Sequence, residues 1–510
     1  MKRVASIAIV GGGSAGWMTA AYLAKVLVGV KVTLIESAKI PTIGVGEATT
    51  PMIHNFLREL GFTSPGQWMP ECEATYKTGI LFENWYEKGD WYWHPFELLD
   101  YVDDHVHTGH CWLSRHAEKG GGYHDRLSFY QQYFCSTALN VGQKKMPIYD
   151  DLLAYHFDAA RFGKLLKSVS PAVTHIVDEV LEVNVDAQGD IAGLVTAAHG
   201  TLTADLYVDC TGFRRQLIGK AGPPQKFESW ADSLFNDRAL VVRMRYDPKG
   251  DIESQMHPYV KASAQSAGWI WSIPLYDKLS VGYVYSSNFL SEADAERELE
   301  AYCGDGYKDA VVRQSVRFMT GKLPSLWAKN CVAIGLSGGF VEPLESSGLA
   351  ITQVGIELLA SMLDARYYDE RISARYDMSM DKFYLDIIHF ITAHYCFTSR
   401  DDTPYWAAVK NDTRIVPELE ARLDVFRRHL PTAGTKGTRE TGSAFRDISW
   451  FCVLLGTNFH FDVPKPGDRA IEAADRIAVE KRRIAKELAG KVPNHFRYLE
   501  SEIYRRPPAR

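Results

Sequence analysis

The chain has 510 residues, of which 46% are hydrophobic and 24% are charged, enough for a large core in two or three intertwined domains. Its formal net charge is −6 and it has no long basic run, which argues against nucleic acid or an anionic membrane surface as a partner. The eight cysteines form no CxxC pair and do not cluster with histidines, so we expect reduced thiols in a cytoplasmic protein and no metal site. No apolar run reaches the roughly 18 residues of a membrane helix.

The first residues predict a dinucleotide site. The run "VASIAIV" (4–10) is typical of a buried parallel strand, and "WMTAAYLAKVL" (17–27) predicts a helix. Between them, "GGGSAG" has GxGxxG spacing, and such glycines let the backbone approach a pyrophosphate at a helix N-terminus. We therefore expect the pyrophosphate to lie against Gly11, Gly13, Ser14, Ala15 and Gly16.

The next strand adds a group for the ribose. "KVTLIES" (31–37) carries Glu36, 20 residues after the last glycine, where dinucleotide folds place an acid that binds a ribose hydroxyl. The same charge would repel a 2′-phosphate, which argues against NADP. Two later strand-to-loop junctions, 204–217 and 330–353, favour FAD over NAD, although each alone could be an ordinary junction.

The stretch "ATYKTGILFENW" (74–85) places Lys77 among apolar and aromatic neighbours. A surface lysine whose stem covers apolar surface is the simple interpretation. The residues themselves leave a functional alternative open.

Further along, "YHFDAARFGKLLKSV" (155–169) predicts a helix entered through Asp158, a favoured N-cap residue. The alternating runs 238–246 and 279–286 predict strands of a second, inserted sheet. Helices dominate from about residue 355, and 469–490 predicts a packed surface helix.

The stretch "GWIWSIPL" (268–275) could be a core strand with both indoles on one face. It also contains GWxWxIP, a motif of the flavin-dependent halogenases. Together with other motifs in order, the chain from residue 4 to about 456 resembles this family, most closely the tryptophan halogenases. The other motifs are "GGGSAGWMTA", "IGVGEATTP" (43–51), "YKTGILFENW", "YHFDA", "DCTGFR" (209–214) and "FVEPLESSGL" (340–349).

The resemblance implies a two-component enzyme with FAD as cofactor. A separate NADH-dependent flavin reductase would supply FADH2, and FADH2 with O2 would oxidise chloride or bromide to hypohalous acid. The oxidant would pass through a tunnel to a small aromatic substrate and halogenate it by electrophilic substitution. Homodimers are common among such proteins, so a homodimer is a further expectation.

Site residues follow from the matched motifs. Lys77 would polarise the hypohalous acid or form a haloamine, and Glu345 would hold the oxidant and stabilise the cationic ring intermediate. Ser347 and Gly348 match the turn that binds halide, although a plain helix start is the alternative. Further cofactor contacts are carried over to Ala48, Asp209, Gly212, Gly335 and Leu336.

The resemblance also assigns a tunnel wall and a substrate pocket. The wall would keep the organic substrate away from the flavin, and its residues are Trp269, Trp271, Ile273 and Pro274, for which core packing is the alternative. The pocket would hold a flat indole face by stacking, through His94, Phe96 and Trp450. Several relatives anchor free tryptophan through a Tyr-Tyr pair and a glutamate, but the matching stretch 431–450 has no tyrosine. Free tryptophan, indole and a larger indole compound therefore all stay open.

The expected fold is α/β: a glutathione-reductase-like FAD-binding module with an inserted second sheet and a mostly helical C-terminal part. The FAD-binding box would span 1–365, with 1–100, 150–220 and 325–365 on the flavin and with 101–149 and 221–324 as sheet and substrate-side segments. Residues 366–510 would form the helical part that covers the substrate. Two other functions compete, a single-component FAD-dependent aromatic hydroxylase that uses NADPH and a non-catalytic flavin-binding module.

Overall fold

The structure is a computed structural model of the chain, and it describes residues 1–40, 46–103, 106–141, 152–247, 249–308, 310, 312–431 and 443–505. The chain divides into two compact units. The first unit consists of Met1–Ala74, Phe157–Ala231 and Phe318–Leu385, and the second consists of Thr75–His156, Asp232–Arg317 and Asp386–Arg510. Residues 75–100, expected in the flavin box, thus group with the second unit.

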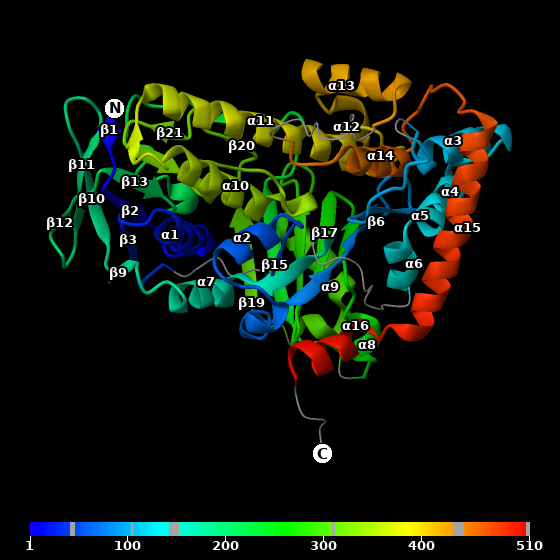
Figure 1. Cartoon of the computed structure of the whole chain (residues 1–510), viewed down its shortest axis with the longest axis horizontal. Helices are drawn as coiled ribbons and strands as arrows, with labels where there is room; N and C mark the ends of the chain where they lie inside the picture. Colours follow the sequence, from blue (N-terminus) through cyan, green and yellow to red (C-terminus); the bar gives the residue numbers. More distant parts are fainter. Residues whose placement is uncertain are drawn as a thin grey trace. The chain divides into compact units, whose positions relative to one another are not determined.

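A mostly parallel sheet forms the centre of the first unit (Figure 1). Neighbouring strands are parallel except for the antiparallel pair at one edge, β21–β22. Strand β2 is apolar and buried along almost its whole length, as expected for a strand covered on both faces. Within the described residues the strand order is β21 (Trp327–Ala328), β22 (Cys331–Ala333), β13 (Leu206–Asp209), β2 (Ser6–Val10), β3 (Lys31–Glu36) and β9 (Thr174–Val177).

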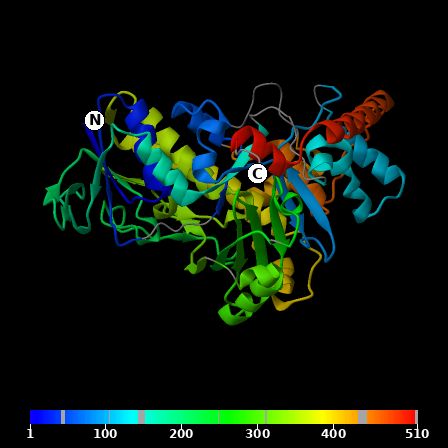
Figure 2. The same cartoon turned by 90° about the horizontal axis from the view of Figure 1, so that it is seen from below.

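Helices cover this sheet, and smaller strand groups complete the unit. Helix α1 packs against both α7 and α10 (Figures 1 and 2). The helices are α1 (Ser14–Val26), α2 (Ile53–Glu59), α7 (Ala159–Ser168), α10 (Ser347–Met362) and α11 (Glu370–Tyr395), the last of which continues into the second unit. The 3₁₀ turns are η1 (Pro65–Gln67), η2 (Pro70–Cys72), η4 (Gly212–Arg214), η6 (Gly335–Ser337) and η7 (Pro343–Glu345). The remaining strands are β1 (Lys2–Arg3), β4 (Gly46–Ala48), β10 (Val180–Val185), β11 (Ile191–Thr196), β12 (Thr201–Leu202), β14 (Glu228–Ser229), β20 (Gly321–Lys322), β23 (Gly339–Phe340) and β24 (Tyr367–Tyr368).

The predicted helix at 155–169 is wrong for its first residues. Residues Ala154–Asp158 form strand β8, and the helix begins at Ala159. The N-cap prediction is confirmed, because the Asp158 carboxylate accepts hydrogen bonds from the backbone N–H groups of Ala160 and Arg161, both at 3.0 Å. The helical periodicity therefore starts only after the cap.

The inserted second sheet is confirmed and forms the centre of the second unit. It is antiparallel except for the parallel pair β16–β6. Its strand order is β19 (Val312–Arg317), β15 (Arg238–Met244), β18 (Leu279–Tyr285), β17 (Gly268–Pro274), β16 (Val260–Ala264), β6 (Gly79–Glu83) and β7 (Trp91–Pro95). Beside it, the short strand β5 (Thr75–Lys77) pairs antiparallel with β8.

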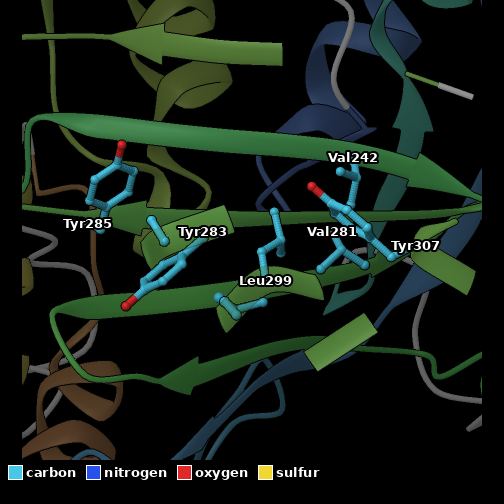
Figure 3. Packing of buried hydrophobic residues seen from close by; sticks show 8 residues of the cluster. Val242, Val281, Tyr283, Tyr285, Leu299 and Tyr307 are labelled. Atoms are coloured by element: carbon cyan, nitrogen blue, oxygen red, sulfur yellow. The ribbon is translucent and has the colours of Figure 1, made fainter. Parts of the chain in front are cut away.

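Buried apolar side chains pack together on one face of this sheet (Figure 3). Val281, Tyr283 and Tyr285 alternate along β18 and therefore share a face. Helix α9 (Glu292–Cys303) and the turn η5 (Gly304–Tyr307) cover that face with Leu299 and Tyr307. Ile270 of β17, the strand of the predicted tunnel wall, belongs to the same apolar layer.

Helices make up most of the C-terminal part, as expected. Helix α15 buries Ile471, Ala474, Ala478 and Ala485 against α3, α5 and α6, which confirms the predicted packed surface helix (Figures 1 and 2). The helices of this unit are α3 (Thr108–Glu118), α4 (Tyr123–Arg126), α5 (Ser128–Tyr133), α6 (Cys135–Val141), α8 (Ile252–Gln255), α12 (Pro404–Asp412), α13 (Pro417–Arg428), α14 (Asp447–Gly456), α15 (Asp468–Lys491), α16 (His495–Tyr498) and the π-helical turn η8 (Leu499–Ile503).

Candidate active site

Most of the residues expected on the flavin lie at one edge of the parallel sheet. Val10 of β2, Asp209 of β13 and Ala333 of β22 are register partners at the carboxyl ends of their strands. Loops that follow these ends form the usual ligand crevice of open α/β sheets. The glycine turn, the end of β3 and the loops after β13 and β22 all lie at this carboxyl edge of the sheet, although these segments are far apart in the sequence.

The glycines of the first turn have different roles. A Cβ on Gly11 would lie 2.2 Å from the Cys210 carbonyl oxygen, and a Cβ on Gly16 would lie 1.8 Å from the Gly11 carbonyl oxygen. A Cβ on Gly13, the N-cap of α1, would meet nothing within 4 Å. Gly11 and Gly16 thus allow tight packing, whereas Gly13 leaves open space in front of the helix N-terminus, formed by Ser14 and Ala15. This open space fits the pyrophosphate of a dinucleotide.

Glu36 ends β3 next to this turn, and its carboxylate has a partner that the sequence did not predict. His175 of β9 contacts it, with 2.6 Å between Nε2 and Oε1. The other carboxylate oxygen, Oε2, lies where a Cβ of Gly12 would be. The adjacent parallel strand carries the histidine, which explains why no local pattern indicated this pair.

The carboxylate of Asp209 shapes the next loop. It accepts hydrogen bonds from the N–H and hydroxyl of Thr211, at 2.8 and 2.6 Å, and from the N–H groups of Leu217 and Ile218, at 2.8 and 2.9 Å. Asp209 is completely buried, so its contribution to a cofactor site would be to hold the loop that contains Gly212.

Two further predicted cofactor residues lie in the turn after β22. Gly335 has a φ of +74°, and a Cβ on it would approach the Cβ of Ala15 to 2.8 Å, so this turn lies directly against the start of α1. Leu336 follows in the same turn, η6. Ala48 is buried at the end of β4, in the same unit; residues 43–45 of its motif lie outside the described residues.

The predicted halide turn also belongs to the first unit. Glu345 ends the turn η7 and is almost completely buried. Ser347 begins α10 and is equally buried, and its hydroxyl has no hydrogen-bond partner within the ranges that the structure describes. A Cβ on Gly348 would meet nothing within 4 Å. A buried hydroxyl, an open glycine and a helix N-terminus together fit a small anion.

In the second unit, Lys77 has no exposed surface, so the interpretation as a surface lysine is wrong. It lies on β5, and its ammonium nitrogen is 5.0 Å from the centre of the Phe96 ring. A cation at this distance from a ring face is stabilised by the ring quadrupole. The structure therefore brings the predicted catalytic lysine and a predicted substrate residue together.

The predicted substrate residues are part of a larger aromatic group. His94 lies with its ring centre 5.9 Å from that of Phe96 and 5.5 Å from that of Phe390. Phe390 packs edge-on against Trp450 at 5.0 Å and stacks with Phe445 at 3.9 Å. We call His94, Phe96, Phe390, Phe445 and Trp450 the aromatic cluster. Its flat, apolar surfaces suit an aromatic ligand.

Phe390 and Phe445 were missed from the sequence. Phe390 lies near the C-terminal end of α11, where an apolar residue indicates core packing, and Phe445 follows the stretch 432–442, which lies outside the described residues. Asp386 holds Phe445 in place, since its carboxylate accepts hydrogen bonds from the N–H groups of Ala444 and Phe445, at 2.7 and 3.2 Å. The contact with Asp386 is long-range, so no sequence pattern indicated that Phe445 belongs to the aromatic cluster.

The predicted tunnel wall is strand β17, all of which is buried, including Ile273 and Pro274. The rings of Trp269 and Trp271 are 6.1 Å apart, as expected for residues on the same face of a strand. Trp271 lies over Gly282 of β18, where a Cβ would come within 2.1 Å of the indole. Glycine at this register position is therefore what lets the indole lie flat on the sheet.

One group of side chains could hold a metal ion within the described residues: Glu87, Asp90 and His124. His124 faces both carboxylates, with Nδ1 3.0 Å from Asp90 and Nε2 3.4 Å from Glu87. Burial, followed by the hydrogen bond and charge of Glu87, raises the pKa of Asp90 to about 6. An imidazole that bridges two carboxylates explains this group without a metal ion.

Comparison with known proteins identifies the family. The tryptophan halogenase family profile matches residues 6–474. The chain is 36% identical to tryptophan 6-halogenase SttH from Streptomyces toxytricini, over 97% of each chain, and 36% identical to 7-chloro-L-tryptophan 6-halogenase KtzR from Kutzneria sp. (strain 744), over 96% of this chain and 98% of the other.

Solved structures agree. The crystal structure of SttH matches with a TM-score of 0.88 at 35% identity, covering 97% of this chain and 99% of the other. Xcc4156, a flavin-dependent halogenase from Xanthomonas campestris, matches with a TM-score of 0.87 at 31% identity, covering 100% of both chains. The chain belongs to the tryptophan halogenase family and is a flavin-dependent halogenase. Among the described residues, no helix is both long and apolar enough to span a membrane.

Proposed function

We propose that this enzyme halogenates the indole ring of a small aromatic substrate, using FADH2, O2 and chloride or bromide. The observation that carries the proposal is the complete burial of Lys77 beside the aromatic cluster. A buried ammonium acts on a nearby ligand with little screening by water. Here the lysine lies where an aromatic ligand would stack.

The first unit would hold the cofactor. The open side of Gly13, the start of α1, the acid at Glu36 and the loops of Asp209–Gly212 and Gly335–Leu336 fit the pyrophosphate and ribose of FAD. Bound reduced FAD, with O2, supplies the oxidising equivalents that turn halide into hypohalous acid. The buried hydroxyl of Ser347 and the N–H groups at the start of α10, next to Gly348, would hold the halide.

Lys77, in the second unit, would bind the hypohalous acid. Its ammonium polarises the oxygen by hydrogen bonding, which makes the halogen more electrophilic toward a stacked indole. A haloamine on Lys77 would perform the same transfer. Glu345 would orient the oxidant and stabilise the positive charge of the ring intermediate, a role that rests on its motif and its burial.

Strand β17 would prevent direct contact between the organic substrate and the flavin. Trp269 and Trp271 fill one face of it with two buried indoles, and Ile273 and Pro274 continue the buried wall. Excluding the substrate leaves halide as the group that is oxidised, so this wall favours halogenation over hydroxylation. Family membership likewise argues against the hydroxylase and the non-catalytic flavin module.

For the substrate, the aromatic cluster supports an indole, and the names of the relatives favour tryptophan. SttH is a tryptophan 6-halogenase, and KtzR acts on 7-chloro-L-tryptophan. The stretch in which several relatives anchor the amino-acid end has no tyrosine here, which keeps indole and larger indole compounds as candidates. We further propose that a separate NADH-dependent reductase supplies the FADH2. The proposal also includes a homodimer and a cytoplasmic location.

A coupled assay tests this function. The enzyme is incubated with a flavin reductase, FAD, NADH, O2 and either chloride or bromide, and tryptophan and indole are compared by mass spectrometry. We expect a halogenated product that is absent with Lys77→Ala. A hydroxylated product without halogen, or flavin reduction by NADPH without the reductase, would contradict the proposal.

A further inference from the structure

A buried histidine lies on the same strand pair as Lys77. Strands β5 and β8 are antiparallel, and their register places Thr75 opposite His156 and Lys77 opposite Ala154. Directly opposite residues share a face, as do residues two apart along a strand, so the side chains of Thr75, Lys77 and His156 lie on one face. All three have no exposed surface.

The hydrogen bonds of Thr75 determine which ring nitrogen of His156 carries the proton. The Thr75 hydroxyl lies 2.6 Å from the carbonyl oxygen of Pro274, which can only accept, so Thr75 donates its single hydrogen there. The same hydroxyl lies 2.9 Å from Nδ1 of His156. That contact is a hydrogen bond only if Nδ1–H donates to the Thr75 oxygen. The imidazole is therefore protonated at Nδ1, which leaves a lone pair on Nε2.

The imidazole is also held neutral. Burial, and after it the charge of Lys77, lowers the pKa of His156 well below its ordinary value; His495 and His257 contribute in the same direction. His495 itself has both nitrogens engaged, since Nε2 accepts from the N–H of Tyr76 at 3.2 Å and Nδ1 lies 3.1 Å from the Met256 carbonyl oxygen. Lys77 is thus the first of the charged groups that act on His156.

The lone pair on Nε2 of His156 is unsatisfied among the residues that the structure describes. Nε2 of His156 is buried and has no hydrogen-bond partner in the part of the chain that the structure describes. Buried acceptors are almost always satisfied, and the exceptions tend to be sites where a ligand binds or chemistry occurs. Here the unsatisfied acceptor shares a strand face with the lysine that is proposed to handle hypohalous acid.

We propose that His156, fixed by Thr75 and Pro274, is a positioning residue for halogen transfer: its Nε2 accepts the O–H hydrogen of the hypohalous acid whose oxygen Lys77 binds. With the oxygen held at two points, the halogen is directed toward the stacked ring. The inference rests on the proposed function of Lys77. It also assigns a function to the end of the GWxWxIP motif, because the carbonyl group of Pro274 fixes the Thr75 hydroxyl.

The reaction balances without a further reagent. The carbon–halogen bond forms as the oxygen–halogen bond breaks, and the electron pair of that bond stays on oxygen. The oxygen takes a proton from the Lys77 ammonium and leaves as water, and the proton lost by the ring restores the ammonium. His156 holds the O–H hydrogen throughout and stays neutral.

Two pairs of variants test the proposal. Thr75→Val removes the hydroxyl that contacts His156, and Thr75→Ser keeps it. His156→Asn leaves an amide only near the position of Nδ1, whereas the longer side chain of His156→Gln places an amide near the position of Nε2. Thr78→Val is the matched control, because the buried hydroxyl of Thr78 likewise donates to a proline carbonyl, that of Pro258, at 2.7 Å. Thr78 lies just after the end of β5, and its hydroxyl contacts Asn140 at 3.1 Å and not His156.

With FADH2 supplied, we expect Thr75→Val and His156→Asn to lower kcat for the halogenated product about tenfold, with KM of the aromatic substrate unchanged, because holding the oxidant matters only for transfer. Hypohalous acid captured by an added chemical trap should rise correspondingly. Thr75→Ser, His156→Gln and Thr78→Val should stay within about twofold of the unaltered enzyme. Equal losses in Thr75→Val and Thr78→Val, or normal kcat in His156→Asn, would overturn the inference.

Two controls separate this outcome from other failures. If Lys77→Ala still halogenates, the proposed function itself is wrong; if Lys77→Ala is inactive while His156→Asn is normal, only this inference fails.

Should a variant not fold, NMR of the unaltered enzyme with ¹⁵N-labelled histidine provides an independent readout. We expect one imidazole, assigned through His156→Gln, that is protonated at Nδ1 and does not titrate between about pH 5.5 and 8.5. An Nε2-protonated or titrating ring would overturn the inference.

Discussion

The ammonium nitrogen of Lys77 lies 5.0 Å from the centre of the Phe96 ring, and the lysine has no exposed surface. A proposed catalytic group and a proposed substrate contact are thus direct neighbours within one compact unit. The cation can act on a ligand ring that stacks in the aromatic cluster. Their proximity links halogen transfer to the way in which the substrate is bound.

Replacing Lys77 by methionine should lower the rate of halogenated product about 10²- to 10³-fold, the usual cost of removing a preorganised group that stabilises a transition state. Methionine keeps the buried stem but has no amine. Oxidation of halide, measured with a chemical trap, should continue, because the residues proposed to bind FAD belong to the other unit. Lys77→Arg keeps the charge and tests whether a haloamine is needed. Substantial product from Lys77→Met would contradict the role of the lysine.

Gly13→Ala should weaken FAD binding without loss of stability. The new methyl group meets no protein atom within 4 Å, so it would occupy the space proposed for the pyrophosphate. We expect at least a tenfold higher Kd, about 1.4 kcal/mol of binding free energy. Gly66→Ala is the matched control, because its Cβ is equally free of contacts and lies outside the glycine turn. Titration of the flavin fluorescence measures both variants, and an unchanged Kd for Gly13→Ala would argue against this cofactor site.

Phe445→Leu should raise KM for the aromatic substrate about two- to tenfold, since a well-placed aromatic pair contributes about 0.5–1.5 kcal/mol beyond its buried area. The Phe445 ring stacks on Phe390 at 3.9 Å in the aromatic cluster. Phe397→Leu serves for comparison, because its ring contacts Phe459 at 5.1 Å and lies outside the cluster. Steady-state kinetics with tryptophan and indole would reveal the change. The same shift in both variants would indicate a general loss of packing and not a substrate contact.

The raised pKa of Asp90 makes stability depend on pH. The folded carboxyl keeps its proton up to about pH 6, whereas the ordinary value is 3.8, so folding takes up a proton between these limits. The contribution of Asp90 to stability is therefore largest below about pH 4 and falls as the pH rises to about 6. Asp90→Asn should be about 1–2 kcal/mol more stable than the unaltered protein at pH 7.5, and this gain should vanish near pH 4.

Chemical unfolding at pH 4, 5.5 and 7.5 measures that difference. Burial is the main cause of the raised Asp90 pKa, and Glu87 adds to it, so Glu87→Gln should reduce the pH dependence only in part; His124 lowers the same pKa. A gain from Asp90→Asn that is the same at every pH would show that the carboxyl does not titrate as proposed.

Local rules predicted much of the fold. The strand–glycine–helix unit at the start of the chain, the N-cap at Asp158 and the packed helix α15 follow from hydrogen bonding and periodicity over a few residues, which are properties of the local sequence. The same rules assigned residues 155–158 to the helix, although they form a strand, because the pairing partner β5 lies far away in the sequence.

The sequence by itself determined the family and the types of residue that the reaction needs, because its motifs are short and keep their spacing. Only the tertiary structure decided that Lys77 is buried against Phe96, that Glu36 meets His175, and that Phe390 stacks on Phe445. Each of these contacts joins residues from separate segments or separate secondary-structure elements. Burial and electrostatic environment depend on which segments pack together, and that information is not contained in any local stretch of the chain.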